Sequence, residues 1–237
     1  MFPNYHNFSG CKCLERTIKR FDVGINIPNN IYDNYCRYHF SVVQKLKSAE
    51  YHLERLKEIS SRPGIAEYAF KNTSKFLFEI NLSLDGFLYF CGSALDIFAR
   101  DILTYYDLIP PPPNDVYFDK ALDLITQNNP GNMIIPRLLN ISWLDRFRNY
   151  RNCSTHEEMI SSNFGVTIGL SATETTRSLQ LKLPDDPKRY PRTYNRRDTI
   201  LTVYCESTFK SILRLFNTIY IDLNDLVVMN GNLPLTP

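Results

Sequence analysis

The stretch WLDRFRNYRNCSTHEE, residues 143–158, combines three arginines and a histidine with large aromatic side chains. If it forms a helix of about 100° per residue, Leu144, Phe147 and Arg151 lie along one stripe, because they are spaced by three and four residues. A guanidinium in an apolar stripe needs an acidic partner or a bound anion, since an unpaired buried charge is costly. Arg151 is therefore the arginine of this stretch that is expected to do chemistry.

His156 is the second candidate for chemistry in this stretch. On an unbroken helix it lies about 140° from Arg151, so the two meet only if the helix ends or distorts between them. The intervening residues NCST are weak helix formers that compete for backbone hydrogen bonds, which favours such a distortion. The negative end of the helix dipole would favour protonated His156. The alternative interpretation is structural: Arg151 caps or pairs at a helix end beside a solvated histidine.

The segment RNCSTH resembles the R-x4–6-H motif of the HEPN superfamily (higher eukaryotes and prokaryotes nucleotide-binding), with Arg151, polar Asn152 and His156 in the motif's positions. The resemblance in layout covers roughly residues 70–223. A long central helix, FEINLSLDGFLYFCGSALDIFARDIL, precedes the motif, and a hairpin with the loop LPDDP follows it, as in one HEPN subgroup. Glu158 stands where some HEPN toxins carry a modified tyrosine, so regulation by that route is not expected.

The resemblance implies a metal-independent ribonuclease that works as a homodimer and brings two motifs together. His156 would act as general base or acid at the ribose 2′-hydroxyl and the leaving oxygen, a task that suits its ordinary pKa near 6.5. Arg151 would hold the scissile phosphate, and Asn152 would support the same site. Such a protein is expected to be a toxin with an antitoxin protein as partner, or an antiviral effector.

Polar residues on the central helix could support Arg151. They fall within about 100° of arc on a largely apolar rod: Asn81, Asp85, Gly92, Asp96 and Arg100. Asp96 or Asp85 is expected to orient Arg151, with Arg148, which lies between the apolar and wet sides of its helix, as a further supporting residue. Arg146 is expected on the wet side. The alternative for the acids is local pairing, such as Asp96 with Arg100.

The segment KRYPRTYNRR places five cations and two tyrosines in ten residues. Cations on phosphates and aromatic rings under bases are what single-stranded RNA binding needs. The expected RNA-binding residues are Lys188, Arg189, Arg192, Arg196 and Arg197. The alternative is a solvated loop, with Asp185 and Asp186 as counter-charges.

Helical spacing of apolar residues predicts about five helices. They are expected at 31–61, from between 65 and 75 to about 106, at 115–129, from 137 through the motif stretch, and at 198–223. A two-residue period at 166–170 and 179–183 predicts a β-hairpin at about 165–183, before the last helix. The expected fold class is therefore mainly α, a bundle of about five helices of HEPN type with one inserted hairpin.

The totals are those of an ordinary globular protein of 237 residues, with a net charge of +2 that does not by itself imply nucleic acid. Residues 1–30 are expected to form an irregular arm and residues 31–237 a single HEPN-like domain. The start has no apolar signal region, and the most apolar stretch is interrupted by polar residues, so no membrane span is expected. The six cysteines are then expected to be reduced thiols in the cytoplasm.

No cofactor or metal is expected. Cys11 and Cys13 with His6 do not match a tetrahedral zinc pattern, and no glycine-rich phosphate loop is present. Two function hypotheses follow: an endoribonuclease of HEPN type, and a non-catalytic HEPN-like module that binds RNA, a nucleotide or a protein partner.

Overall fold

The computed structural model describes residues 29–105, 108, 117–128, 141–157, 160, 163–170, 175–196 and 199–230. The expected N-terminal arm lies outside these residues, except that its last two positions begin the first helix. The cysteine and histidine positions considered for zinc, and Arg197 of the basic segment, also lie outside them.

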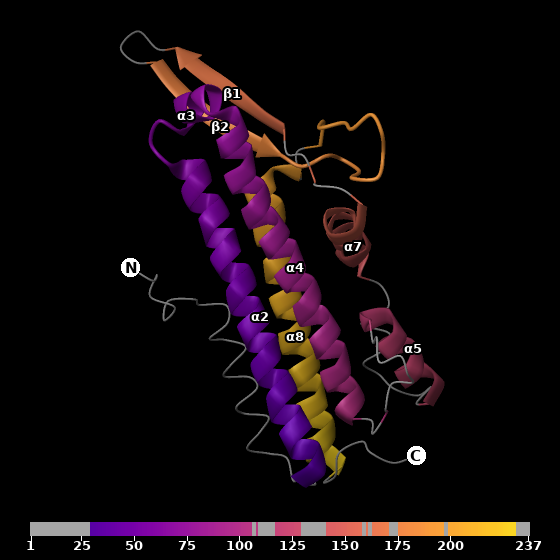
Figure 1. The fold of residues 1–237 in the computed structure, drawn as a ribbon. Coiled ribbons are helices and arrows are strands. Elements are labelled where there is room, and N and C mark those ends of the chain that lie inside the picture. Colours follow the sequence, from indigo (N-terminus) through magenta and orange to yellow (C-terminus); the bar gives the residue numbers. More distant parts are fainter. Residues whose placement is uncertain are drawn as a thin grey trace. The chain divides into compact units, whose positions relative to one another are not determined.

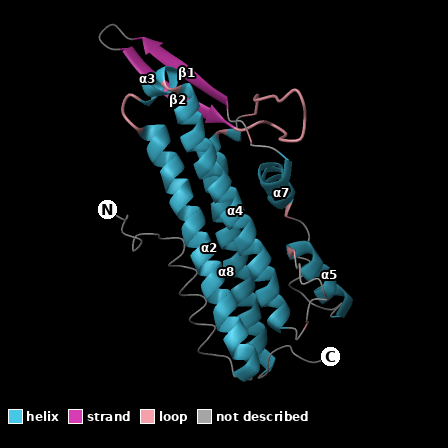
Figure 2. Cartoon of the chain, viewed as in Figure 1, coloured by secondary structure: helices cyan, strands magenta, loops and turns pink. Residues whose placement is uncertain are grey.

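The described chain is mainly helical, with a small two-stranded antiparallel sheet (Figures 1 and 2). Its elements, in order, are α2 (Asn29–Ser61), α3 (Ile65–Lys71), α4 (Thr73–Tyr105), α5 (Phe118–Asn128), α7 (Ser142–Asn152), the π-helical turn η2 (Cys153–Glu157), β1 (Asn163–Leu170), β2 (Thr175–Lys182) and α8 (Leu201–Asn230). The prediction of a mainly α fold with a hairpin before the last helix is confirmed.

A short helix, α3, lies between α2 and the expected second helix, and its two ends are marked by local backbone features. Gly64 adopts a left-handed backbone, with φ of 72°, which glycine reaches without steric cost. Asn72 ends α3, and its N–H donates to the carbonyl of Tyr68. Thr73 then opens α4, so the long central helix begins near the late end of the expected range.

The chain divides into two compact units. One comprises Met1–Lys47, Phe90–Ser142 and Lys210–Pro237, and the other comprises Ser48–Tyr89 and Trp143–Phe209. Each of the three long helices therefore contributes residues to both. The second unit holds all the predicted site residues except Asp96. The expectation of one domain from 31 to 237 stays a prediction.

The first unit has an aromatic core around Phe98. Its ring stacks on that of Phe216, with centroids 4.0 Å apart, and meets the edge of Tyr220 at 5.2 Å. A buried polar cluster lies beside this core: His39 Nε2 lies 2.8 Å from Oδ2 of Asp101, and the Tyr220 hydroxyl donates to the same oxygen at 2.7 Å. The cluster joins three helices by charge-assisted hydrogen bonds away from water.

The second unit packs the hairpin on α3 and the start of α4. Phe164 of β1 meets the rings of Phe70 and Phe76 edge-on, and its register partner Leu181 is buried. Val166 pairs with Leu179 in the same register. The two-residue period thus aligned the apolar positions of both strands, as a hairpin with one packed face requires.

The central helix α4 is apolar on most sides. Within the described residues it is long and apolar enough to cross a membrane by length and composition, and 56% of that window is buried inside the molecule. A mostly buried helix of this kind is also typical of the core of a soluble protein. Gly86 lies where α4 approaches α2: a Cβ there would come within 2.4 Å of the His52 ring.

Candidate functional site

Helix α7 packs one apolar side into the second unit. Leu144, Phe147 and Tyr150 are buried there, and Tyr150 donates a hydrogen bond from its hydroxyl to the carbonyl oxygen of Pro184. Arg151 is half-buried beside them. The predicted stripe of Leu144, Phe147 and Arg151 is therefore apolar at its start and partly open to solvent at its arginine.

Arg146 is not on a wet side of α7, and this expectation was wrong. Its guanidinium carbon lies 5.9 Å from the ring centroid of Tyr150 and 5.4 Å from that of Tyr204. Two of its nitrogens, Nε and Nη2, are buried. The reason is that α8 supplies Tyr204, whose ring covers this side of α7, and an arginine over aromatic rings is favourable.

The helix distorts between Arg151 and His156, as the sequence predicted. α7 ends at Asn152, and the next five residues form the π-helical turn η2. Thr155 donates its hydroxyl to the carbonyl of Arg151, the local bond by which threonine competes with helix hydrogen bonds. A π turn advances by fewer degrees per residue than an α turn, so it brings position 156 round towards Arg151. The side chain of His156 lies outside the described residues.

Asp85 of α4 holds this turn. Its Oδ1 accepts a hydrogen bond of 2.5 Å from the Ser154 hydroxyl, three residues after Arg151. Burial raises the pKa of Asp85, and the bond from Ser154 offsets this only in part. The sequence predicted that Asp96 or Asp85 orients Arg151, and for Asp85 this stays a prediction. In the structure its hydrogen bond goes to Ser154, so Asp85 positions the backbone that carries the motif.

Two other expected supporting residues have different surroundings. Arg148 lies 3.3 Å from the carboxylate of Asp145 one turn earlier, in a pair at the surface of α7. Asp96 belongs to the first unit, whereas Arg151 belongs to the second. A role for Asp96 in orienting Arg151 therefore stays a prediction.

The loop that carries the basic segment packs against η2, Cys153–Glu157, which is called the motif turn below because it carries His156. Cys153, the first residue of η2, is fully buried, and its thiol donates to the carbonyl of Pro187 at 3.7 Å. Nη2 of Arg192 lies 4.0 Å from the same sulfur. Together with the bond from Tyr150 to Pro184, these contacts hold the loop after β2 over the end of α7. Two regions that the sequence singled out separately are thus neighbours.

Asp185 closes this loop. Its carboxylate accepts hydrogen bonds from the backbone N–H groups of Asn195 and Arg196, both at 2.9 Å, and from the Thr193 hydroxyl at 2.8 Å. Partial desolvation acts to raise the pKa of Asp185. The bonds from these donors and the charge of Arg196 outweigh it, so the pKa is lowered. Asp185 is therefore the structural anchor of a loop that spans residues 185–196.

The loop presents most of its cations to solvent. Lys188, Arg189 and Arg196 are exposed, Tyr190 is 89% exposed, and Arg192 is half-buried beside Cys153. Asp186 accepts from the backbone N–H of Lys188 at 2.9 Å. Both acids of LPDDP bond to loop backbone, and Asp185 also interacts with the charge of Arg196, so Lys188 and Arg189 are the exposed cations that a polyanion would meet first.

Sequence reasoning missed Cys153 and Ser154 as the links from the motif turn to the loop and to α4. No spacing rule could find them, because Asp85 and Pro187 are 69 and 34 residues away in the chain. In the part of the chain that the structure describes, no group of three or more His, Cys, Asp or Glu side chains is arranged to hold a metal ion. A scan against protein-family models, a search of curated proteins and a search of solved structures each found no match to this chain.

Proposed function

We propose that the protein is a metal-independent endoribonuclease of HEPN type, with a helical bundle of that family. The observation that carries the proposal is the contact between the motif turn and the basic loop through Cys153, Pro187 and Arg192. A ribonuclease needs groups for proton transfer beside groups that bind the phosphate backbone. Here η2, which carries His156 and directly follows the end of α7 with Arg151, contacts a loop with exposed cations.

In this proposal His156 transfers protons at the 2′-hydroxyl and the leaving oxygen. Arg151 holds the scissile phosphate with its planar fork and stabilises the charge that develops on it, with Asn152 as support. Asp85 acts through Ser154, by fixing the backbone of η2. Lys188, Arg189 and Arg196 bind phosphates on either side of the cut, together with Arg192 and Arg197.

A homodimer belongs to the same proposal. Leu144 and Phe147 are buried within the second unit, so they are not available to a partner. Helix α4 instead exposes an apolar stripe: Phe78, Leu82 and Tyr89 are 61%, 59% and 48% exposed. Spacings of four and seven residues put them on one side of the helix, and a second copy could cover them.

The test is the rate of cleavage of labelled RNA in the presence of a chelator. His156→Ala is expected to lose about 10²–10⁴-fold in rate, the usual share of acid–base catalysis. Arg151→Lys is also expected to fail, because an ammonium does not reproduce the bidentate phosphate fork. The matched control is Arg55→Lys, at an exposed arginine that pairs with Glu58 on α2. Equal rates for wild type and His156→Ala would contradict the proposal.

The non-catalytic module is the second candidate, and the burial of the motif turn favours it. Cys153 is fully buried, and Asn152 and Ser154 are half-buried, which limits the approach of a phosphate to this turn. RNA binding without cleavage would select this candidate. A toxin or antiviral role, with an antitoxin partner, predicts growth arrest on expression of wild type and normal growth with His156→Ala.

A further inference from the structure

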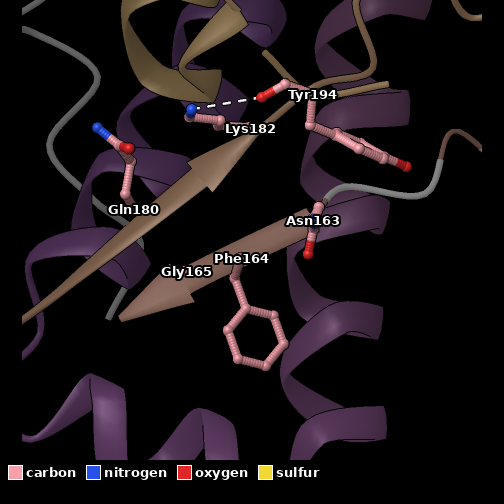
Figure 3. A pocket seen from close by; sticks show the side chains of 6 residues that line it. All are labelled: Asn163, Phe164, Gly165, Gln180, Lys182 and Tyr194. Carbon is pink, nitrogen blue, oxygen red and sulfur yellow. Dashed lines mark hydrogen bonds between the residues drawn. The ribbon is translucent and has the colours of Figure 1, made fainter. Parts of the chain in front are cut away.

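A cavity of about 210 Å³ lies at the open end of the hairpin, in the second unit. It is lined by Asn163, Phe164, Gly165, Gln180, Lys182 and Tyr194 (Figure 3). Five of these come from β1 and β2, and Tyr194 comes from the basic loop. The cavity therefore lies between the hairpin and the basic loop, the same loop that contacts the motif turn.

The cavity exists because β1 carries a glycine where a side chain would fill it. Gly165 pairs with Gln180 in the hairpin register, and a Cβ built on Gly165 meets no atom within 4 Å. Phe164, one position earlier, points to the other side of the hairpin from Gln180 (Figure 3) and packs on Phe70 and Phe76. Strand alternation therefore leaves an open floor at Gly165 on the side away from the core.

The polar groups around this floor suit a flat ligand with hydrogen-bonding edges. The amides of Asn163 and Gln180 are exposed, and each offers both donors and an acceptor. Lys182 Nζ donates to the carbonyl of Tyr194 at 3.3 Å, which fixes the loop at the rim and places a positive charge there. Tyr194 is half-buried and lines the cavity, and it is the aromatic residue that the loop brings to this rim.

We propose that this cavity binds an unpaired base of single-stranded RNA. The base would stack on Tyr194 and bond through its edge to the amides of Asn163 and Gln180, the mode by which proteins read splayed-out bases. Lys188 and Arg189, on the same loop as Tyr194, would bind the flanking phosphates. This inference rests on the proposed function and deepens it, because it assigns part of the substrate to a place outside the motif turn.

The experiment measures binding of a fluorescent single-stranded oligoribonucleotide by anisotropy, with all variants in a His156→Ala background so that cleavage does not interfere. Gly165→Val places a branched side chain in the cavity; its Cβ meets no atom within 4 Å and valine favours the strand, so its melting temperature should equal or exceed that of the background protein. Its affinity should fall about tenfold, as should that of Tyr194→Ala, a loss typical of one stacked base. Tyr194→Phe keeps the ring and should bind normally.

Unchanged affinity in both Gly165→Val and Tyr194→Ala would overturn the inference, as would absence of binding by the background protein at micromolar concentrations. Equal binding of the same sequence as a duplex would also overturn it. Failure of the ribonuclease proposal is distinguishable: wild type would not cleave RNA, while the cavity variants would still lose affinity.

Discussion

Asp85 is the residue that ties the central helix to the motif turn. Its carboxylate is half-buried and accepts from Ser154 at 2.5 Å, and burial raises its pKa. The folded state therefore holds the Asp85 proton to a higher pH than the unfolded chain does. Ionisation of Asp85 therefore lowers the free energy of unfolding. This loss is absent below the unfolded-state pKa of about 3.9 and grows as pH rises through the higher pKa of the folded state. At neutral pH the charge on Asp85 therefore destabilises the folded state.

Asp85→Asn is expected to keep or raise the free energy of unfolding at pH 7, because an amide oxygen still accepts from Ser154 without the buried charge. Near pH 4 the difference from wild type should shrink, since the raised pKa keeps more of the folded wild-type carboxyl protonated there than at pH 7. Asp85→Leu removes the acceptor and should cost about 1–3 kcal/mol. Urea unfolding at the two pH values measures both effects.

A loss of more than about 1 kcal/mol in Asp85→Asn at pH 7 would contradict this expectation. It would indicate that the negative charge itself is used, as in the predicted orientation of Arg151 by Asp85.

The arginines of α7 show what could be predicted for single residues. Helical spacing identified Leu144 and Phe147 as buried, because that depends only on position along the helix. It misplaced Arg146, because Tyr204 reaches it from α8, more than 50 residues later in the sequence. The solvent exposure of a charged side chain therefore depends on tertiary contacts as well as on its position along the helix.

The loop from 185 to 196 supplies the cations of the candidate site, whereas α7 and η2 carry Arg151 and His156. One carboxylate closes it: Asp185 accepts from Thr193, Asn195 and Arg196, and its own N–H donates to the carbonyl of Thr193 at 2.7 Å. The pKa of Asp185 is lowered by these bonds. Their contribution to stability is therefore present above the ordinary aspartate pKa and is lost as pH falls through the lowered folded-state value.

Asp185→Ala is expected to open this loop without unfolding the helices. Trypsin cleavage after Lys188 and Arg189 should become about tenfold faster, the effect of losing roughly 1.4 kcal/mol of local hydrogen bonding. The control is Asp186→Ala, which removes the bond to the backbone of Lys188. It should change the rate by much less. Equal cleavage rates in the two variants would show that Asp185 does not hold the loop.

Element order was largely predictable, and the packing of elements was not. The hairpin period and the helical spacing depend on residues near in sequence, so both were found. The separate short helix α3 was not predicted, because the break at Asn72, with φ of −131° and ψ of 45°, has no strong sequence signature. The contact of the basic loop with Cys153 depends on how α7 and β2 are brought together, which no local pattern encodes.

At the scale of the whole molecule, the apolar stripe of α4 argues for self-association. Wild type is expected to be a dimer by light scattering at tens of micromolar. Leu82→Glu should give a monomer, because it places a charge in the middle of the stripe. Val203→Glu, at a 52% exposed valine on α8, is the matched control and should remain dimeric. A monomeric wild type would remove α4 as an interface.

The most direct test of the central claim is the chemistry of the cut. Wild type is incubated in chelator with one oligoribonucleotide and with the same sequence fully 2′-O-methylated, and the product ends are identified. Attack by the 2′-hydroxyl predicts cleavage of the unmodified RNA alone, to products with a 2′,3′-cyclic phosphate and a 5′-hydroxyl, and His156→Ala should slow it about 10²–10⁴-fold. Cleavage of the methylated strand, or products with 5′-phosphates, would contradict the assignment of His156 and Arg151 as the catalytic pair.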